Sequence, residues 1–377
     1  MVETDDIGSS SSGQHSTANC YLATTSAFAA STISGHSFVF GMQGENSSGT
    51  PKAYVGRFAA SGGTINSGII DGMRLDQTGD DGGTFAGTYT APNTTYGRFT
   101  LTITPTGQSS SVTMAVYIID ANRMFMLETA GDSGEQAGDM RKQLQTSYSG
   151  ANLNAKFVLY SQAYEYSNGS VSAYDSYVFQ GTGNSTGGLT INQSYSDKNG
   201  TYQVGGEDGG PIAVTFDTSN PGRATFSPGG SDSVYLYFFN NNSAIELDLS
   251  SNGYLESGWV EAQSQTTFTD AGVAGNYMLG QLPPMSATQN GNVGEFDLSS
   301  AGGITGGITT ASEGYFTWDQ AQTMTYTWDT SVAGTGTFLV ADPSNPGKGG
   351  ASCAVISATK AACIIQSDKA SVLILQQ

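Results

Sequence analysis

The most constraining feature of this chain is a unit that occurs three times. The dipeptide Gly-Gly returns at Gly62-Gly63, Gly187-Gly188 and Gly302-Gly303, at intervals of 125 and 115 residues, each time between two strand-like runs. A second landmark keeps the same order: Gly97-Arg98-Phe99-Thr100, Gly222-Arg223-Ala224-Thr225 and Gly334-Thr335-Gly336-Thr337. Landmarks that recur in one order at nearly one period indicate tandem copies of one supersecondary unit. The 377 residues therefore divide into three units, each large enough to bury a core.

The composition of each unit is typical of an antiparallel β protein. Gly accounts for 51 residues, and runs rich in Val, Ile, Tyr and Phe alternate with short polar turns. The first unit has eight such runs between residues 37 and 143, and short connections join neighbouring strands antiparallel. The sequence predicts three tandem eight-stranded up-and-down barrels, with two-sheet β-sandwiches as the alternative. The predicted boundaries are an N-terminal arm, partly flexible, over residues 1–32 and repeat units over 33–144, 145–267 and 268–377.

The N-terminal arm has two parts. Residues 9–13 read Ser-Ser-Ser-Ser-Gly, which is typical of a flexible segment. Residues 20–33 include Tyr21, Leu22 and Phe28, and they have enough β-forming residues for an added strand that pairs with a sheet edge in this chain or in a neighbouring one. A disordered tether is the alternative.

The charge balance bears on partners and compartment. The chain has 32 acidic and 13 basic residues and a net charge of −19. A nucleic-acid partner is not expected, because phosphate binding needs clustered Lys and Arg and these are scattered. No run of about 18 apolar residues is present, so no transmembrane helix is predicted. Residues 2–6, Val-Glu-Thr-Asp-Asp, do not begin a signal peptide, and the composition favours an extracellular or cell-surface protein whose leader has been removed.

Three cysteines add to the argument for export. Cys353 and Cys363 lie at equal distances from Ala358 in an apparent turn, which places them opposite each other on a predicted hairpin. A cross-strand disulfide and two buried thiols both fit this spacing. Cys20 is then left over, either free or intermolecular.

A family resemblance rests on short segments of the first unit. They are Val55-Gly56-Arg57-Phe58, Gly62-Gly63-Thr64-Ile65-Asn66-Ser67-Gly68, Phe85-Ala86-Gly87-Thr88-Tyr89 and Gly97-Arg98-Phe99-Thr100-Leu101-Thr102. These segments resemble uncharacterised Gly/Thr-rich repeats in large exported proteins of environmental bacteria, particularly acidobacteria. The likeness covers most of residues 33–377. It implies an exported, surface-associated role and supplies no catalytic residues.

Catalytic signatures are weak. The two histidines, His15 in the arm and His36 at the first strand, do not predict a multi-histidine metal site. Residues 183–187 match the Gly-x-Ser-x-Gly pattern, but they lie in a predicted hairpin turn instead of a strand-to-helix turn. Two carboxylates meeting in one cleft would support a hydrolase. We expect a protein without enzymatic activity.

An acidic loop is the candidate metal site. Asp76, Asp80 and Asp81 precede the fourth strand of the first unit and are followed by Gly82-Gly83. Oxygen-rich loops of this kind bind calcium, yet Asp-Gly is also ordinary turn chemistry and the spacing matches no EF-hand. Calcium is the one cofactor that the sequence suggests, and a plain turn is the alternative.

Aromatic residues are the candidate ligand-binding site. Tyr326 and Trp328 share one face of a predicted strand, and Trp318 lies just upstream. Trp259 lies on the closing strand of the second unit. These side chains either fill the barrels or line a pocket for a sugar ring or a small apolar molecule. Residues 234–239, Val-Tyr-Leu-Tyr-Phe-Phe, are apolar on both faces, which predicts that a neighbouring barrel covers their outer side.

Two functions from different classes follow. The first is an exported, non-enzymatic structural or adhesive surface protein that associates with itself or with other surface proteins. The second is a binding module that takes a glycan or a small apolar molecule in a barrel interior or in a groove between barrels. A cavity beside Trp318, Tyr326 and Trp328 would favour the second function.

Overall fold

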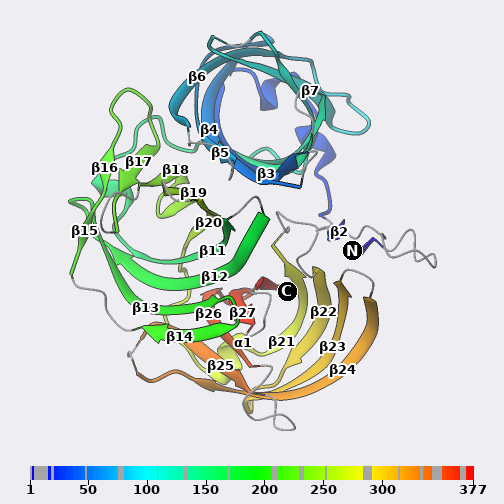
Figure 1. Cartoon of the computed structure of the whole chain (residues 1–377), viewed down its shortest axis with the longest axis vertical. Helices are drawn as coiled ribbons and strands as arrows, with labels where there is room; N and C mark the ends of the chain where they lie inside the picture. The colour runs from blue at the N-terminus through cyan, green and yellow to red at the C-terminus, as the bar shows by residue number, and fades with distance from the viewer. Residues whose placement is uncertain are drawn as a thin grey trace.

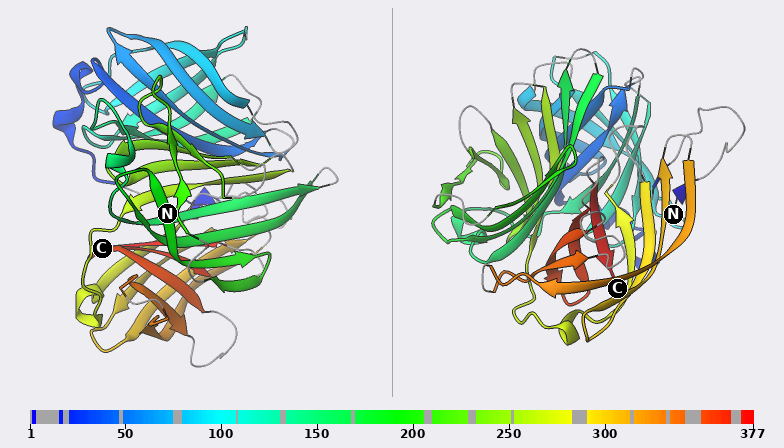
Figure 2. Two further views of the ribbon diagram at one scale, coloured as in Figure 1. Left: turned by 90° about the vertical axis from the view of Figure 1, so that its left-hand side faces the viewer. Right: turned by 60° about the horizontal axis from the view of Figure 1, so that its bottom comes forward.

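Three β units follow one another along the chain. The computed structural model describes residues 2–3, 16–17, 21–46, 49–74, 80–107, 109–130, 134–167, 170–205, 210–228, 233–250, 253–282, 291–312, 315–331, 334–341, 350–365 and 371–377. Figure 1 and Figure 2 show the units stacked along the long axis of the molecule, with the second unit between the first and the third. A two-stranded sheet of β1 (Val2–Glu3) and β2 (Ser16–Thr17) precedes them.

The first unit, barrel 1, is a closed barrel of eight antiparallel strands. Each strand pairs with its neighbours in the chain, and the last strand closes on the first, with Met140 opposite Phe40. This closure distinguishes the unit from the β-sandwich alternative. The strands are β3 (His36–Asn46), β4 (Pro51–Ser61), β5 (Thr64–Arg74), β6 (Asp80–Tyr89), β7 (Arg98–Pro105), β8 (Val112–Ile118), β9 (Arg123–Ala130) and β10 (Gly134–Lys142).

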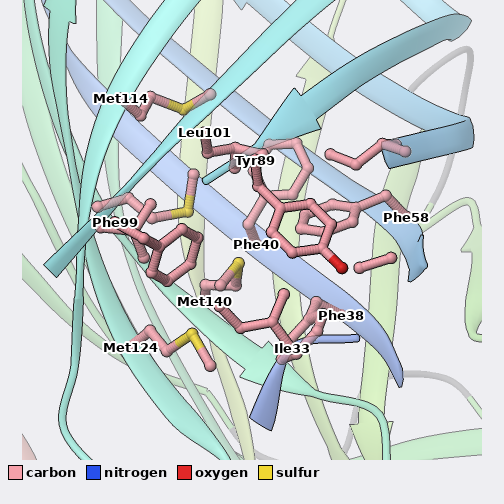
Figure 3. Packing of buried hydrophobic residues seen from close by; sticks show 14 of the residues in the cluster. Ile33, Phe38, Phe40, Phe58, Tyr89, Phe99, Leu101, Met114, Met124 and Met140 are labelled. Carbon is pink, nitrogen blue, oxygen red and sulfur yellow. The ribbon is translucent and has the colours of Figure 1, made fainter. Parts of the chain in front are cut away.

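Side chains fill the lumen of barrel 1. Because alternate residues of a strand point to opposite faces, Phe38 and Phe40 of β3 point inward while Val39 points out. Figure 3 shows these rings packed with Phe58 and several methionines. The ring centroids of Phe40 and Phe58 are 6.1 Å apart. Methionine adapts to irregular gaps between such rings, so the barrel has a packed core instead of a channel.

The second unit is an open sheet of ten strands, where the sequence predicts a closed barrel of eight. Its central strands keep the meander, and its first and last long strands pair, with Tyr160 opposite Trp259. The strands are β11 (Lys156–Ser167), β12 (Ser170–Gly183), β13 (Gly188–Lys198), β14 (Thr201–Gly205), β15 (Ile212–Ala213), β16 (Thr215–Phe216), β17 (Arg223–Phe226), β18 (Val234–Asn240), β19 (Ser243–Ser250) and β20 (Tyr254–Ala262).

The physical reason for the opening is a broken fourth strand. In barrel 1 a single strand, β6, pairs with both β5 and β7. Here β14 pairs with β13 over residues 194–198, β15 pairs with β13 only at Gly188 and Leu189, and β16 pairs with β17. The chain between Gly205 and Ile212 separates β14 from β15, and within the described part of the chain β14 pairs with β13 alone. The insertion is visible in the sequence, but its effect on closure depends on pairing between distant strands.

The third unit, barrel 3, is again a closed barrel of eight antiparallel strands. Its last strand pairs with its first, with Leu375 opposite Leu279. The strands are β21 (Gly275–Gln281), β22 (Gly291–Leu298), β23 (Gly303–Ser312), β24 (Tyr315–Trp328), β25 (Thr337–Ala341), β26 (Ala351–Ser357), β27 (Lys360–Ile365) and β28 (Ser371–Gln376). The chain thus has two closed barrels, and between them lies an open sheet with a similar order of strands.

Each unit begins with a short helical turn that packs into its own lumen, and we call these segments the plugs. The plugs contain η1 (Thr25–Ala27) and η2 (Ala30–Thr32) in the first unit, η3 (Gly150–Asn152) in the second and α1 (Asp270–Val273) in the third. Each plug inserts an aromatic and an aliphatic side chain: Phe28 with Ile33, Tyr148 with Leu153, and Phe268 with Val273. Over residues 21–33 the structure therefore replaces the predicted added strand with turns that belong to barrel 1.

Three glycines receive the aromatic rings of the plugs. Gly97, Gly222 and Gly336 have φ angles of 63°, 95° and 72°, a backbone region that favours glycine. A Cβ on Gly97 would collide with Phe28, one on Gly336 would collide with Phe268, and one on Gly222 would lie 3.4 Å from Tyr148. Gly336 is therefore the third-unit counterpart of Gly97, which corrects the sequence alignment on Gly334 by two residues.

Neighbouring units cover both outer faces of the second unit. Tyr235 and Tyr237 of β18 pack against Val55 of barrel 1, as the apolar run 234–239 predicts. On the other side, Val178 of β12 packs against the outer face of barrel 3. Burial of apolar surface contributes about 25 cal/mol per Å², so both junctions stabilise the whole chain.

Candidate functional site

The structure places the predicted aromatic site in the core of barrel 3. Tyr326 is 3% exposed, and its hydroxyl donates a hydrogen bond to the carbonyl oxygen of Ser299 at 2.8 Å. The indole Nε1 of Trp328 donates to Asp270 Oδ1 of the plug at 2.7 Å. Tyr326 and Trp328 therefore serve as core residues that hold the plug. Trp318 lies in β24, and its side chain is outside the described part of the chain.

Trp259 lies at the junction between barrel 1 and the second unit, far in the chain from the other predicted aromatic residues. The guanidinium Cζ of Arg141 in barrel 1 lies 5.2 Å from the Trp259 ring centroid, a cation–π geometry. The ring of Phe239 meets Trp259 edge-on, with centroids 6.3 Å apart. Trp259 therefore packs in the clusters at the junctions between units, whereas Tyr326 and Trp328 pack in the core of barrel 3.

The predicted calcium loop lies mostly outside the described residues. Asp76 is not among them, and Asp80 and Asp81 open β6 with side chains that the structure does not describe. Among the side chains that are described, no group of three or more His, Cys, Asp or Glu residues has the geometry of a metal site. Calcium at this loop stays a prediction.

A disulfide joins Cys353 of β26 to Cys363 of β27. The two residues are direct partners across the hairpin, as their symmetric placement about Ala358 predicts. Both are buried in the core of barrel 3, at 0% and 2% exposure. Cys20 lies outside the described residues. The bond joins β26 and β27, two neighbouring strands of barrel 3.

The first junction between units contains a buried carboxylate. Asp71 of β5 has no exposed surface (0%), and Arg223 of the second unit binds both its oxygens, Nε to Oδ2 at 2.8 Å and Nη2 to Oδ1 at 3.0 Å. The hydroxyl of Tyr237 donates to Asp71 Oδ2 at 2.6 Å, and the backbone N–H of Gly82 donates to Oδ1 at 2.5 Å. Burial and the Asp71 carboxylate raise the pKa of Tyr237, so its hydroxyl stays a donor. A buried charge paired this fully fixes how the two units meet.

In the first two units, a glutamine that follows the closing strand extends into the next unit. The side-chain amide of Gln143 donates to the carbonyl oxygens of Pro221 and Phe238, both at 2.9 Å. The amide of Gln263 donates to the carbonyl oxygens of Thr335 and Val355 in the same way, at 2.9 and 2.7 Å. Pro221 and Thr335 each precede the glycine that receives a plug. The same coupling therefore occurs at both junctions.

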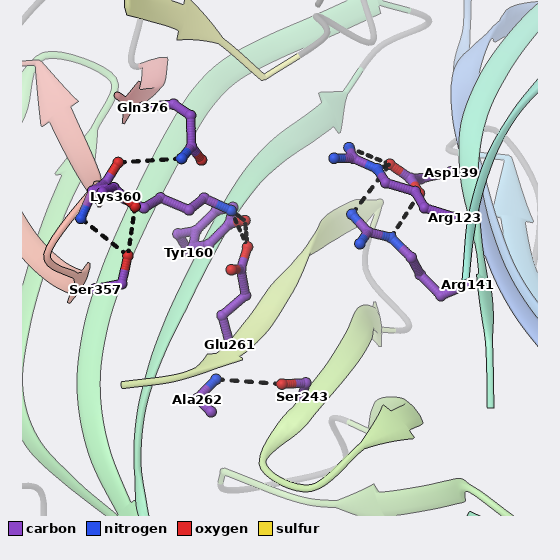
Figure 4. Close-up of polar contacts among 11 residues, drawn as sticks. Arg123, Asp139, Arg141, Tyr160, Ser243, Glu261, Ala262, Ser357, Lys360 and Gln376 are labelled. Atoms are coloured by element: carbon purple, nitrogen blue, oxygen red, sulfur yellow. Dashed lines mark hydrogen bonds and ion pairs between the residues drawn. The ribbon is translucent and has the colours of Figure 1, made fainter. Parts of the chain in front are cut away.

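The second junction contains a polar cluster across the interface with barrel 3. Lys360 of barrel 3 pairs with Glu261 of β20, which also accepts a hydrogen bond from the Tyr160 hydroxyl (Figure 4). Burial raises the pKa of Glu261, but the nearby Lys360 ammonium outweighs this and lowers the pKa below its usual value. Glu261 is thus ionised and paired at neutral pH. Within barrel 1, Arg123 Nη2 lies 2.7 Å from Asp139 Oδ2.

Carboxylates gather in the lumen of the second unit. Glu246 of β19 and Glu256 of β20 are 2% and 8% exposed, and burial raises the pKa of both. Tyr254 donates to Glu256 Oε2 at 2.5 Å, whereas Glu246 Oε2 has no hydrogen-bond partner among the described residues. Burial, followed by the charge of Glu165, also raises the pKa of Asp175 on β12. Burial therefore shifts all three carboxyl groups toward their neutral forms, and Lys198 on the same luminal wall opposes this shift only in part at Asp175 and Glu256.

An open pocket of about 300 Å³ lies on the luminal wall beside these carboxyl groups. Its wall comes from three adjacent strands, β12, β13 and β14, and includes Tyr177, Phe179, Ser194, Ser196, Lys198 and Gln203. The sequence did not predict this pocket. The signal was the inserted segment after Gly205, which breaks the strand that would otherwise continue across the wall.

Comparisons with known proteins identify no family. No family model matches the chain, and no curated protein does. Among solved structures, a double mutant of the vaccine antigen transferrin binding protein B from Haemophilus parasuis is 9% identical, covers 90% of this chain and 75% of its own, and has a TM-score of 0.24. The intact Ap-TbpB structure with N and C lobes is 10% identical over the same shares, with a TM-score of 0.22. Scores this low establish neither a shared fold nor a shared function. Within the described residues, no helix is long and apolar enough to span a membrane.

Proposed function

We propose that this chain is an exported, non-enzymatic surface protein whose three β units form one rigid structural or adhesive body. The observation that carries the proposal is the repeated coupling between units. Gln143 and Gln263 each bind two backbone carbonyl oxygens of the following unit, and Asp71 is buried against Arg223 across the first junction. Independent domains joined by linkers do not need such buried polar contacts.

Two further properties support an extracellular place for this body. The disulfide between Cys353 and Cys363 is of a kind that persists in oxidising compartments. The net charge of −19 keeps a large exposed surface soluble and repels like-charged surfaces. Contact with other surface proteins or with further copies of the chain belongs to the same proposal. Such pairing would occur at β14, a sheet edge that has β13 as its one partner strand among the described residues.

Protease treatment of intact cells that carry the gene tests the location. We expect the protein to be digested on unbroken cells and to be recovered with Cys353 and Cys363 joined when peptides are mapped without reduction. Full protection from protease, together with alkylation of both thiols before reduction, would contradict export.

A further inference from the structure

We infer that the pocket on the luminal wall of the second unit binds one neutral sugar ring of a glycan. The ring is either a terminal or an internal residue of the glycan chain. The inference is independent of the proposed structural role. Barrels 1 and 3 are closed by continuous strand pairing, whereas β14 of the second unit pairs with β13 alone among the residues that the structure describes. In barrels 1 and 3 the corresponding wall faces a closed lumen. In the second unit the broken fourth strand leaves this luminal wall exposed.

The wall has two aromatic rings side by side. Tyr177 and Phe179 are two residues apart on β12, so both point into the lumen. Their ring centroids are 5.6 Å apart and their planes are only 21° from parallel. The rings are therefore stacked, and Phe179, the more exposed of the two, presents the apolar surface on which the C–H face of a pyranose packs.

Polar groups border these rings on the adjacent strands. Ser194 lies opposite Phe179, and Ser196 lies opposite Tyr177 on one side and Gln203 on the other. Hydroxyl and amide groups both donate and accept hydrogen bonds, as the hydroxyls of a sugar do. A few convergent polar groups beside an aromatic surface are typical of small-molecule sites, and 300 Å³ is at the small end of their range.

The residues beneath the pocket hold its wall in place. The Tyr177 hydroxyl lies 3.2 Å from Asp175 Oδ2 and 3.1 Å from the Tyr254 hydroxyl, which in turn contacts Glu256. Tyr177 is only 7% exposed, so its ring is fixed before a ligand arrives. A Cβ at Gly205 would collide with Ser194 Oγ, so the glycine leaves room for that hydroxyl in the pocket.

Charge argues for a neutral ligand. Lys198, the one cation that lines the pocket among the described residues, lies 5.7 Å from the Tyr177 ring centroid. An anionic ligand would enter against the net charge of −19 and approach the luminal carboxyl groups. A cationic ligand would need those groups ionised, which their burial opposes. A neutral, hydroxyl-rich ring avoids both the repulsion by the net negative charge and the need to ionise buried carboxyl groups.

The test is saturation-transfer NMR and calorimetric titration of the full chain with soluble cello-, malto-, xylo- and manno-oligosaccharides at millimolar concentration. An acidic galacturonate oligomer serves as the comparison. We expect binding to at least one neutral series, in preference to the acidic oligomer. Preference for the acidic oligomer, or binding of none of the neutral series, would overturn the inference.

Matched variants locate the binding. Phe179→Leu removes one ring of the pocket, whereas Phe226→Leu removes a ring that packs in the same lumen but does not line the pocket. We expect Phe179→Leu to weaken binding about tenfold, about 1.4 kcal/mol, and Phe226→Leu to leave it unchanged. Gln203→Ala, at an exposed position, checks the result without disturbing the core and is also expected to weaken binding. Equal affinity in all three variants would place the ligand elsewhere and overturn the assignment, while the protease and disulfide results that test the structural role would stand unchanged.

Discussion

Two buried glutamates make the stability of the fold depend on pH in opposite directions. Glu246 lies in the lumen of the second unit, and Glu261 lies at its junction with barrel 3. Burial, then the charges of Glu256 and Asp248, raises the pKa of Glu246 well above its ordinary value. The Lys360 ammonium lowers the pKa of Glu261, despite burial. The free energy of unfolding therefore falls with rising pH through Glu246, because the folded state binds a proton that the unfolded state releases. Through Glu261 it rises with pH, since the folded state prefers the ionised form.

Glutamine substitutions separate the two effects. Glu246→Gln keeps a neutral side chain of the same size, so we expect a higher melting temperature than the unchanged chain at pH 8. The gain, on the order of 1 kcal/mol, disappears below the ordinary Glu pKa of about 4.3. Glu261→Gln is the control with the opposite sign: it lowers the melting temperature at pH 8, and the loss shrinks as the pH falls through its lowered pKa. Scanning calorimetry at several pH values measures both, and parallel curves for the two variants would refute this assignment.

At the scale of elements, the strands were predictable and the plugs were not. Period-two alternation and glycine-rich turns mark each strand, because a strand with one face in the core repeats every two residues. A plug of one or two turns has no such period. Its signal is the recurrence of Phe28, Tyr148 and Phe268 at intervals of 120 residues, each followed five residues later by an aliphatic residue. The pocket of the second unit was also hidden, because the separation of β14 from β17 follows from long-range pairing.

A pair of glycine substitutions in barrel 1 tests the plug. Gly97 and Gly107 both have positive φ angles, 63° and 84°, so alanine strains the backbone at either position. Only at Gly97 would the added Cβ collide with Phe28, since nothing lies within 4 Å of a Cβ at Gly107. We expect Gly97→Ala to lower the melting temperature clearly more than Gly107→Ala, by overpacking of about 1–3 kcal/mol. Equal losses in thermal denaturation would show that the plug does not pack there.

For the whole molecule, we expect the buried contacts at the two junctions to make the three units unfold together. The buried pairing of Asp71 with Arg223 stabilises the assembled state only while both partners are present. Neither partner could be chosen from the sequence, because 152 residues separate them and ordinary surface charges look the same. The repeat itself was readable, since glycines at fixed turn positions recur in all three units.

Removal of one partner across the first junction tests this cooperativity. Arg223→Met leaves the Asp71 carboxylate buried without its counterion, at a cost of about 3–5 kcal/mol. We expect a single calorimetric transition in the unchanged chain to split in this variant, with the second unit melting first. Arg98→Met, at an exposed position, should keep the single transition. One unsplit transition at the original temperature in Arg223→Met would mean that the ion pair does not couple the units.

The middle position of the open unit has an evolutionary consequence. After duplication of a barrel gene, a terminal copy that loses closure exposes its sheet to solvent and to proteases. A middle copy is buttressed by both neighbours, on β18 through Tyr235 and on β12 through Val178. We therefore expect the middle copy to tolerate insertions that would unfold the first or the third copy. Sequence drift in lineages carrying such triplets should accordingly concentrate in the central copy, around the segment between Gly205 and Ile212.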